Sequence, residues 1–260
     1  MPEVQRIAAR AGAAILEVYA RADHGATLKD DASPLTEADL ASHRLIVAAL
    51  EALTPGVPVL SEESAPASVA DRRRWPRCWL VDPLDGTKEF LARNGEFTVN
   101  IALIEGHEPV LGVVGVPARA IIYAGIPGRG AVRVRDVGPP EAIRTQQPAA
   151  WPPRVVGSRS HRGDSLDALL ARLGPHQLVA VGSALKFCIV AEGGADFYPR
   201  LGPTSEWDTA AAHAVLVAAG GAVVGLDGRA LRYNERDDVL NPSFLAYGDA
   251  ARDWLALVPR

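Results

Sequence analysis

The sequence predicts an α/β protein whose two halves are built differently. Residues 3–22 and 36–53 carry apolar side chains at helical spacing, which predicts two helices at the start of the chain. Four apolar, β-branched segments joined by short turns follow within 97–134, and consecutive strands of this kind form an antiparallel meander. From residue 154 onward strand and helix patterns alternate, which is typical of a sheet covered by helices.

Composition narrows the class of protein. The 260 residues are enough for one large domain or two small ones, and 48% of them are hydrophobic, so a substantial core can form. The net charge of −4 argues against a broad nucleic-acid surface. Cys78 and Cys188 are too few for a disulfide framework, so we expect both to be reduced in a cytoplasmic protein.

Membrane insertion is not expected. No apolar stretch is long enough to span a bilayer, and the charges of Glu3, Arg6 and Arg10 rule out a signal peptide. Peripheral attachment at the inner face of the membrane stays open, and so does the choice between a monomer and a homodimer.

The second predicted helix and the strand after it carry acidic residues. Thr36 and Asp39 form a capping-box pattern that starts the helix. A short strand over 57–60 then ends in Ser-Glu-Glu-Ser. Neighbouring side chains on a strand point to opposite faces, so only one of Glu62 and Glu63 can face a given site. A solvated acidic loop is the alternative.

The stretch around residues 79–90 organises the chain. An apolar run over 79–81 predicts a covered strand, and Pro83, which lacks an amide hydrogen, should end it near Asp82. Asp82 and Asp85 then lie on one side of the strand end with the Leu84 carbonyl between them. Two carboxylates this close repel each other unless a cation is present, and hard oxygen ligands favour Mg²⁺ or Mn²⁺.

The second part of the same stretch predicts an anion site. Gly86, Thr87 and Lys88 open a short helix that runs to about Arg93. Free amides at a helix N-terminus attract phosphate, so a metal cluster and a phosphate cradle would lie side by side. This pairing suggests metal-assisted phosphoryl chemistry. A plain strand–turn–helix with capping aspartates is the alternative.

The remaining elements are placed from apolar patterning and turn residues. A proline-rich segment over 137–153 is the candidate boundary between an N-terminal half, 1–150, and a C-terminal half, 151–260. The meander strands are expected at 97–104, 109–116, 120–126 and 131–134. In the second half, strands are expected at 154–156, 178–181, 196–198, 222–224 and 244–247, and helices at 166–173, 182–192, 207–219 and 250–257.

Two charged residues of the second half are ambiguous from spacing. Lys186 falls in the first turn of a helix, where a cation is disfavoured by the helix dipole, so it either binds an anion or is an ordinary exposed lysine. Asp208 begins the alanine-rich helix and is either a simple dipole-favoured aspartate or a further carboxylate of the metal cluster.

Three segments together resemble the signatures of a known family. Residues 60–64 (LSEES), 82–87 (DPLDGT) and 207–211 (WDTAA) look like the three motifs of the inositol monophosphatase superfamily, which are magnesium-dependent, lithium-sensitive phosphatases. Within it, residues 85–90 running into 94–100 most resemble the bacterial 3′(2′),5′-bisphosphate nucleotidases. The resemblance implies a layered αβαβα sandwich with the site between its halves.

The resemblance also implies roles for single residues. Two or three Mg²⁺ ions, for which Mn²⁺ can substitute, would be held by Glu62, Asp82, the Leu84 carbonyl, Asp85 and Asp208. Thr87, backed by Asp39 and with Glu62 nearby, would orient and help deprotonate the attacking water. The amides of Gly86 and Thr87 would hold the phosphoryl oxygens.

The implied substrate is a small bisphosphorylated nucleotide, adenosine 3′,5′-bisphosphate, which would be hydrolysed to AMP and phosphate. Lys186 and Arg200 would bind the phosphate that is not cleaved, and adenosine would lie near His161. The further substrate contacts would be Ser158, Arg159, Ser183 and Asp208.

Three alternative functions are open from the sequence. An inositol-phosphate phosphatase could use the same scaffold. An aspartyl-phosphate phosphatase is disfavoured because Asp85 follows Asp82 by three residues, whereas that class places its second acid two residues on. A non-catalytic, metal-dependent sensor of phosphate or nucleotide is the rival outside enzymes.

Overall fold

The computed structural model describes residues 1–258 apart from 22, 29–33, 65–66 and 158–163, and the chain begins with the two predicted helices. α1 (Pro2–Tyr19) buries one face that includes Val4, Ile7 and Ile15. α2 (Glu37–Leu53) starts where the capping pattern places it, because Asp39 Oδ2 accepts the Thr36 backbone N–H at 2.8 Å. Both helices pack on the same face of the first sheet.

The first sheet contains the predicted meander. Its strand order is β3-β4-β5-β6-β7-β8-β9, with β3 parallel to β4 and every later pair antiparallel. The strands are β3 (Val59–Ser61), β4 (Arg77–Asp85), β5 (Thr98–Glu105), β6 (Glu108–Val116), β7 (Ile121–Ile126), β8 (Gly130–Arg135) and β9 (Glu141–Ile143).

Alternation along β4 shows why this strand is buried on both faces. Trp79 and Val81 pack with α1 and α2, whereas Cys78 and Leu80 face the opposite side and pack with α6 (Leu185–Ala191) and α7 (Glu206–Ala218). Side chains on both faces of β4 are therefore buried in apolar layers, which explains why residues 78–81 are continuously hydrophobic.

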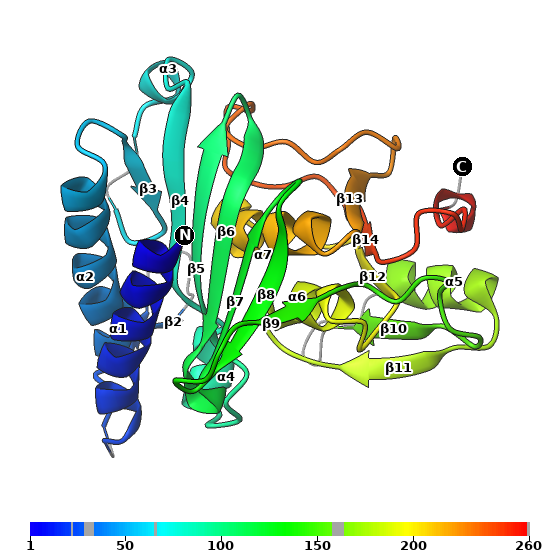
Figure 1. Ribbon diagram of the computed structural model, residues 1–260, viewed down its shortest axis with the longest axis horizontal. Helices are drawn as coiled ribbons and strands as arrows, with labels where there is room; N and C mark the ends of the chain where they lie inside the picture. The colour runs from blue at the N-terminus through cyan, green and yellow to red at the C-terminus, as the bar shows by residue number, and fades with distance from the viewer. Residues whose placement is uncertain (22, 29–33, 65–66, 158–163, 259–260) are drawn as a thin grey trace.

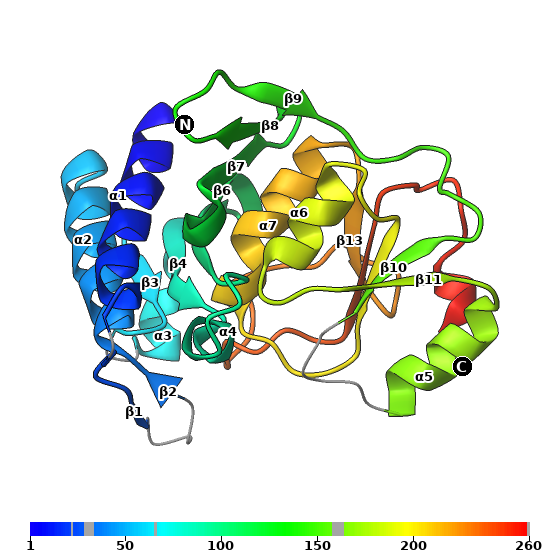
Figure 2. The same cartoon turned by 90° about the horizontal axis from the view of Figure 1, so that it is seen from below.

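The second sheet covers the other side of α6 and α7 (Figure 2). Its order is β11-β10-β12-β14-β13, parallel among the first three strands and antiparallel among the last three. The strands are β10 (Arg154–Gly157), β11 (Gln177–Ala180), β12 (Phe197–Arg200), β13 (Ala222–Gly225) and β14 (Phe244–Tyr247). α5 (Asp164–Leu173) packs on the outer face.

In the described part of the chain the layers thus run helix, sheet, helix, sheet, helix (Figures 1 and 2), and the predicted fold class is confirmed. The division at residue 150 into two halves stays a prediction. Short elements complete the fold: β1 (Thr27–Leu28), β2 (Pro34–Leu35), α3 (Val69–Arg72), α4 (Thr87–Leu91), η1 (Pro117–Arg119) and η2 (Leu255–Leu257).

Two sequence-based expectations were wrong in detail. β4 continues past Pro83 to Asp85, because the pairing with β5 shifts register between Asp82 and Asp85 and no ladder bond is needed from the proline. The final helix predicted over 250–257 is reduced to the 3₁₀ turn η2, and Trp254 stacks on Phe197 instead. The edge strand β9 lies within the segment 137–153, whose role as a boundary stays a prediction.

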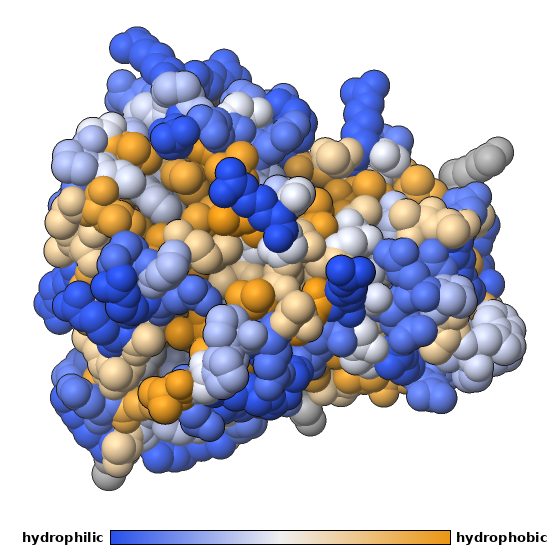
Figure 3. Space-filling model, in the orientation of Figure 1, coloured by the Kyte–Doolittle hydropathy of each residue, from blue (hydrophilic) through white to orange (hydrophobic). Residues whose placement is uncertain are grey.

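None of the helices in the described ranges has the length and hydropathy that a bilayer crossing requires. Figure 3 shows hydrophobic residues mainly over the middle of one face, where the strands lie, and hydrophilic residues toward its rim.

α7 sits directly against glycines of the first sheet. A Cβ added to Gly112 of β6 would lie 2.0 Å from the Ala211 carbonyl oxygen, and one added to Gly125 of β7 would lie 2.7 Å from the Val215 Cα. The helix backbone can approach the sheet this closely only because both positions lack a side chain.

We therefore expect Gly112→Ala to lower the free energy of unfolding by about 2 kcal/mol, since neither the strand nor the helix can yield freely. The melting temperature should fall by about 5 °C in a thermal scan. Gly202→Ala is the matched control, because nothing lies within 4 Å of a Cβ at that position. Equal melting temperatures for the two variants would show that α7 is not seated as described.

A buried histidine of α7 links stability to pH. His213 Nδ1 lies 2.9 Å from the Tyr233 hydroxyl, and burial lowers the pKa of His213 to about 3. The unfolded chain binds a proton at this residue near pH 6.5, whereas the folded chain does so only near pH 3. The folded state therefore loses stability as the pH falls between these values.

Between pH 7.5 and 5.0 this residue should cost the wild type about 2 kcal/mol of stability. His213→Gln cannot titrate, so its unfolding free energy, measured by urea titration at both pH values, should change by about that much less. A variant with the same pH slope as the wild type would contradict the assignment.

Candidate active site

A cavity of about 410 Å³ lies at the end of β4 and is lined by elements from both sheets. Residues before β9 contribute carboxylates and the start of α4, and residues after β10 contribute cations and the start of α7. The polar residues of its lining include Glu62, Asp85, Thr87, Ser183, Lys186 and Asp208.

A bulge at the end of β4 brings two of the acids together. Asp82 pairs with Asn100 of β5 and Asp85 pairs with Thr98, so three steps on β4 oppose two steps on its partner. Residues three apart on a regular strand face opposite sides, and the extra residue corrects this. Asp82 Oδ1 also accepts the Leu84 N–H at 3.0 Å, which tightens the turn.

Acids from distant segments share one region, because Glu62, Asp85 and Asp208 line the same cavity. Burial raises the pKa of Asp82 well above its usual range, and the charges of Glu62, Asp85, Asp208 and Asp39 raise it further. Burial also raises the pKa of Asp208, followed by the charges of Asp85 and Glu62 among its larger causes. The proposed cluster required Asp208 to lie near Asp82 and Asp85, and these mutual effects agree with that.

The donor set suits a hard divalent cation. It consists of carboxylate oxygens and a carbonyl oxygen, and a cation among them would offset the repulsion that raises their pKa values. Within the described ranges no three His, Cys, Asp or Glu side chains are already close enough to form a preformed metal cluster. The assignment of Glu62, Asp82, Leu84, Asp85 and Asp208 as ligands therefore stays a prediction.

Asp39 and Asp208 each cap the start of a helix with one carboxylate oxygen. Asp39 uses Oδ2 for the backbone N–H and the hydroxyl of Thr36, and its Oδ1 lies 3.4 Å from the Thr87 hydroxyl, which donates to it. Asp208 likewise accepts the Ser205 N–H with Oδ2 at 2.8 Å. Each aspartate starts its helix with one oxygen and can serve the site with the other.

Asp85 is held by three donors on one oxygen. Its Oδ2 accepts from the Ala184 N–H at 2.5 Å, the Thr98 hydroxyl at 3.2 Å and the Asn100 amide at 3.4 Å. Burial raises the pKa of Asp85, while the charge of Lys186 and these hydrogen bonds oppose the increase. The carboxylate is therefore fixed in orientation before any ligand arrives.

The opposite wall of the cavity carries cationic and polar groups. Lys186 is buried, and its Nζ lies 5.6 Å from the centre of the Tyr198 ring without a hydrogen bond or ion pair to any described residue. Burial lowers its pKa to about 8, against the charge of Asp85. Ser183 Oγ and Arg200 Nε are buried and also lack partners in the described ranges. These groups can receive an anion.

Some predicted residues cannot be placed. Ser158, Arg159 and His161 lie outside the described residues, so their contacts with a substrate stay predictions.

Gly86 precedes α4 in the left-handed region, with φ 90°, and a Cβ there would lie 3.3 Å from the Ser183 side chain. The turn needs glycine for both reasons.

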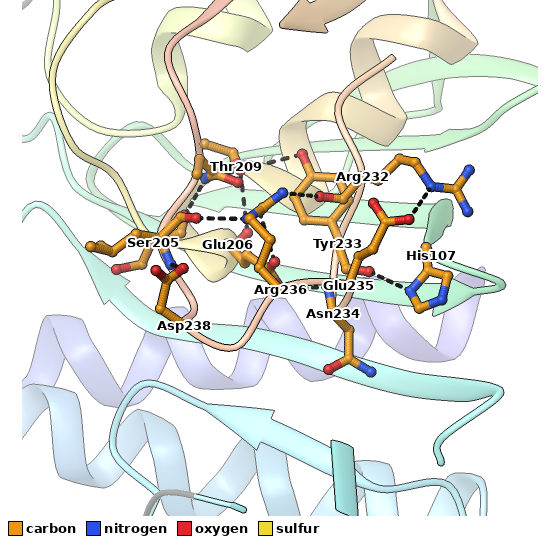
Figure 4. Close-up of polar contacts among 12 residues, drawn as sticks. His107, Ser205, Glu206, Thr209, Arg232, Tyr233, Asn234, Glu235, Arg236 and Asp238 are labelled. Atoms are coloured by element: carbon orange, nitrogen blue, oxygen red, sulfur yellow. Dashed lines mark hydrogen bonds and ion pairs between the residues drawn. The ribbon is translucent and has the colours of Figure 1, made fainter. Parts of the chain in front are cut away.

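Sequence reasoning missed the buried polar residues that hold the N-terminus of α7 (Figure 4). The Glu206 carboxylate accepts the Asn234 N–H at 2.7 Å and the Arg236 guanidinium at 2.9 Å. The Asn241 side chain donates to the Ser205 carbonyl at 2.8 Å and to the Thr209 hydroxyl at 3.0 Å. These contacts hold the first turn of α7, which carries Asp208. No local sequence motif predicts them.

The layered sandwich and the acid-lined cavity between its sheets define a class, and the chain belongs to it: the inositol monophosphatase family, whose pattern matches residues 3–256. The resemblance inferred from the three motifs is confirmed. A curated relative, the 3′(2′),5′-bisphosphate nucleotidase CysQ of Salmonella typhimurium, is 51% identical over 246 residues, which are 94% of this chain and 98% of the relative.

Solved structures agree. The CysQ protein of Bacteroides thetaiotaomicron superposes with a TM-score of 0.81 at 42% identity, covering 95% of both chains. An inositol monophosphatase from Anabaena gives a TM-score of 0.78 at 25% identity, covering 100% of this chain and 96% of the other.

Proposed function

We propose that this protein is a phosphoric monoester hydrolase that removes the 3′-phosphate of adenosine 3′,5′-bisphosphate, giving AMP and phosphate, with Mg²⁺ as its cofactor. The observation that carries the proposal is that acids from both halves and the buried Lys186 share one cavity. The relatives named as bisphosphate nucleotidases, similar over nearly the whole chain, support it.

Bound Mg²⁺, as two or three ions held by Glu62, Asp82, Leu84, Asp85 and Asp208, would supply Lewis-acid polarisation of the ester and a more acidic water. The Thr87 hydroxyl donates a hydrogen bond to Asp39 Oδ1, so the lone pairs of Thr87 Oγ1 are available to accept a hydrogen bond from the attacking water.

The substrate would be held at both of its phosphates. The amides of Gly86 and Thr87 would bind the phosphoryl group that is cleaved. Lys186 and Arg200 would neutralise the second phosphate, with Ser183 as a further donor. Ser158, Arg159 and His161 would complete the nucleoside side of the pocket.

A phosphate-release panel tests the proposal. Adenosine 3′,5′-bisphosphate, 3′-AMP and inositol 1-phosphate are compared with Mg²⁺, with EDTA and with Li⁺. We expect the bisphosphate to be hydrolysed fastest, only with Mg²⁺ or Mn²⁺, and with inhibition by Li⁺. A clear preference for inositol 1-phosphate would favour the alternative phosphatase, and tight binding without turnover would favour a sensor.

A covalent phosphoenzyme trapped by acid quench would instead revive the aspartyl-phosphate mechanism. A cytoplasmic location and a monomeric or homodimeric state stay predictions.

A further inference from the structure

The turn that joins β11 to α6 is bound by two carboxylates, Asp85 at the end of β4 and Glu96 in the segment before β5. The Gly182 N–H donates to Glu96 Oε2 at 2.9 Å, and the Ala184 N–H donates to Asp85 Oδ2 at 2.5 Å. The donors are 86 and 99 residues away from their acceptors in the chain. The residue between the two donors is Ser183, and Lys186 follows one turn later.

The held turn has an unusual shape. Ser183 has φ 47°, in the left-handed region that a residue with a side chain seldom adopts. Its Oγ is buried against the cavity without a hydrogen-bond partner among the described residues. A conformation of this kind persists only where the surroundings enforce it, and the two bonded N–H groups on either side are the visible restraint.

Close packing around Gly182 further restricts the conformation of the turn. A Cβ on Gly182 would lie 2.8 Å from the Glu89 side chain and 3.1 Å from the Glu96 carbonyl oxygen, so the turn packs directly on α4 and on the segment after it. Glu96 is buried, and its other oxygen, Oε1, is 3.4 Å from the guanidinium of Arg119, which is partly exposed. Glu96 does not line the cavity itself.

We propose that Glu96 is a positioning residue for the anion-binding wall: by accepting the Gly182 N–H, it keeps Ser183 and Lys186 directed into the cavity and so sets the preference for a substrate with a second phosphate. This inference rests on the proposed function. Its physical basis is that this buried hydrogen bond is one of the two that hold the backbone from which both side chains project.

Three substitutions separate the hydrogen bond from the charge. Glu96→Gln keeps an acceptor oxygen, Glu96→Asp keeps the charge but is too short to reach Gly182, and Glu96→Ala removes both. KM and kcat are measured with Mg²⁺ for adenosine 3′,5′-bisphosphate and for 3′-AMP, which lacks the second phosphate. Arg119→Ala is the control for the ion pair, which is long and partly exposed.

We expect Glu96→Asp and Glu96→Ala to raise KM for the bisphosphate about tenfold and to leave both constants for 3′-AMP within about twofold of the wild type. Glu96→Gln and Arg119→Ala should retain the wild-type preference. The Asp and Gln variants decide the question even if the Ala variant does not fold.

Equal losses on both substrates would indicate a merely structural role and overturn the inference. So would an Asp variant that keeps the wild-type preference, or a Gln variant that loses it. Failure of the proposed function would look different, because the wild type itself would then show no preference for the bisphosphate over 3′-AMP.

Discussion

Asp82→Asn is expected to lower kcat by about 10³-fold, or about 4 kcal/mol of transition-state stabilisation, while making the metal-free protein more stable. Asp82 is buried, and four other carboxylates raise its pKa in addition to burial. An asparagine can keep the hydrogen bond from the Leu84 N–H and removes only the charge. Such a gain at a functional site is typically 0.5–2 kcal/mol, or roughly 4 °C in melting temperature.

The measurement compares melting curves in EDTA and in Mg²⁺. The wild type should gain stability with Mg²⁺ and the variant should gain less, because the charge that the cation offsets is gone. The pH dependence gives a second readout. The folded-state pKa of Asp82 is raised, so the wild type regains this stability as the pH falls through that pKa toward 3.8, and its deficit against the variant should narrow.

A second buried aspartate supplies the control. Burial alone would raise the pKa of Asp196, but hydrogen bonds from Arg154, at 2.9 Å from both Nε and Nη2, outweigh it and lower the pKa. Asp196→Asn should therefore destabilise the protein, the opposite of Asp82→Asn. If both variants lost stability alike in EDTA, the acids around Asp82 would not be in electrostatic conflict.

The fold was largely predictable because most of its helices and strands show the spacing of apolar residues typical of their kind. The helix pair shows spacing near 3.6 residues, and the strands between Thr98 and Arg135 are separated by short turns, so each element could be placed from its own residues. The bulge after Asp82 could not, because it depends on pairing with Asn100 and Thr98. The final helix failed because packing of Trp254 on Phe197 outweighs local helix preference.

The candidate site divides in the same way. Asp82, Asp85 and Asp208 fall at or near element ends predicted from the sequence, so the pattern alone identifies them as candidate ligands. Glu96 and Glu206 have no such signal, since their partners lie 86 and 28 residues away and only the folded chain brings them together. Candidate binding residues could therefore be proposed from motifs, whereas the residues that hold their segments in place could not.

Lys186→Met is expected to lower kcat/KM for adenosine 3′,5′-bisphosphate by about 10²-fold, or about 3 kcal/mol, with a much smaller effect on 3′-AMP. Methionine fills nearly the same volume, so the packing over Tyr198 is kept and only the charge is lost. The buried ammonium has no hydrogen bond or ion pair to a described residue, and a phosphate in the cavity would be its natural partner.

Lys88→Met is the matched control, since Lys88 also borders the cavity but is exposed to solvent, where a charge contributes little. The dependence of kcat/KM on pH shows whether the charge of Lys186 itself is responsible for binding the bisphosphate. Because the pKa of Lys186 is lowered to about 8, the wild-type kcat/KM for the bisphosphate should decline as the pH rises through that value, and Lys186→Met should lack this decline. A variant that retains the alkaline decline, or that loses equally on 3′-AMP, would place the second phosphate elsewhere in the cavity and remove Lys186 from its recognition.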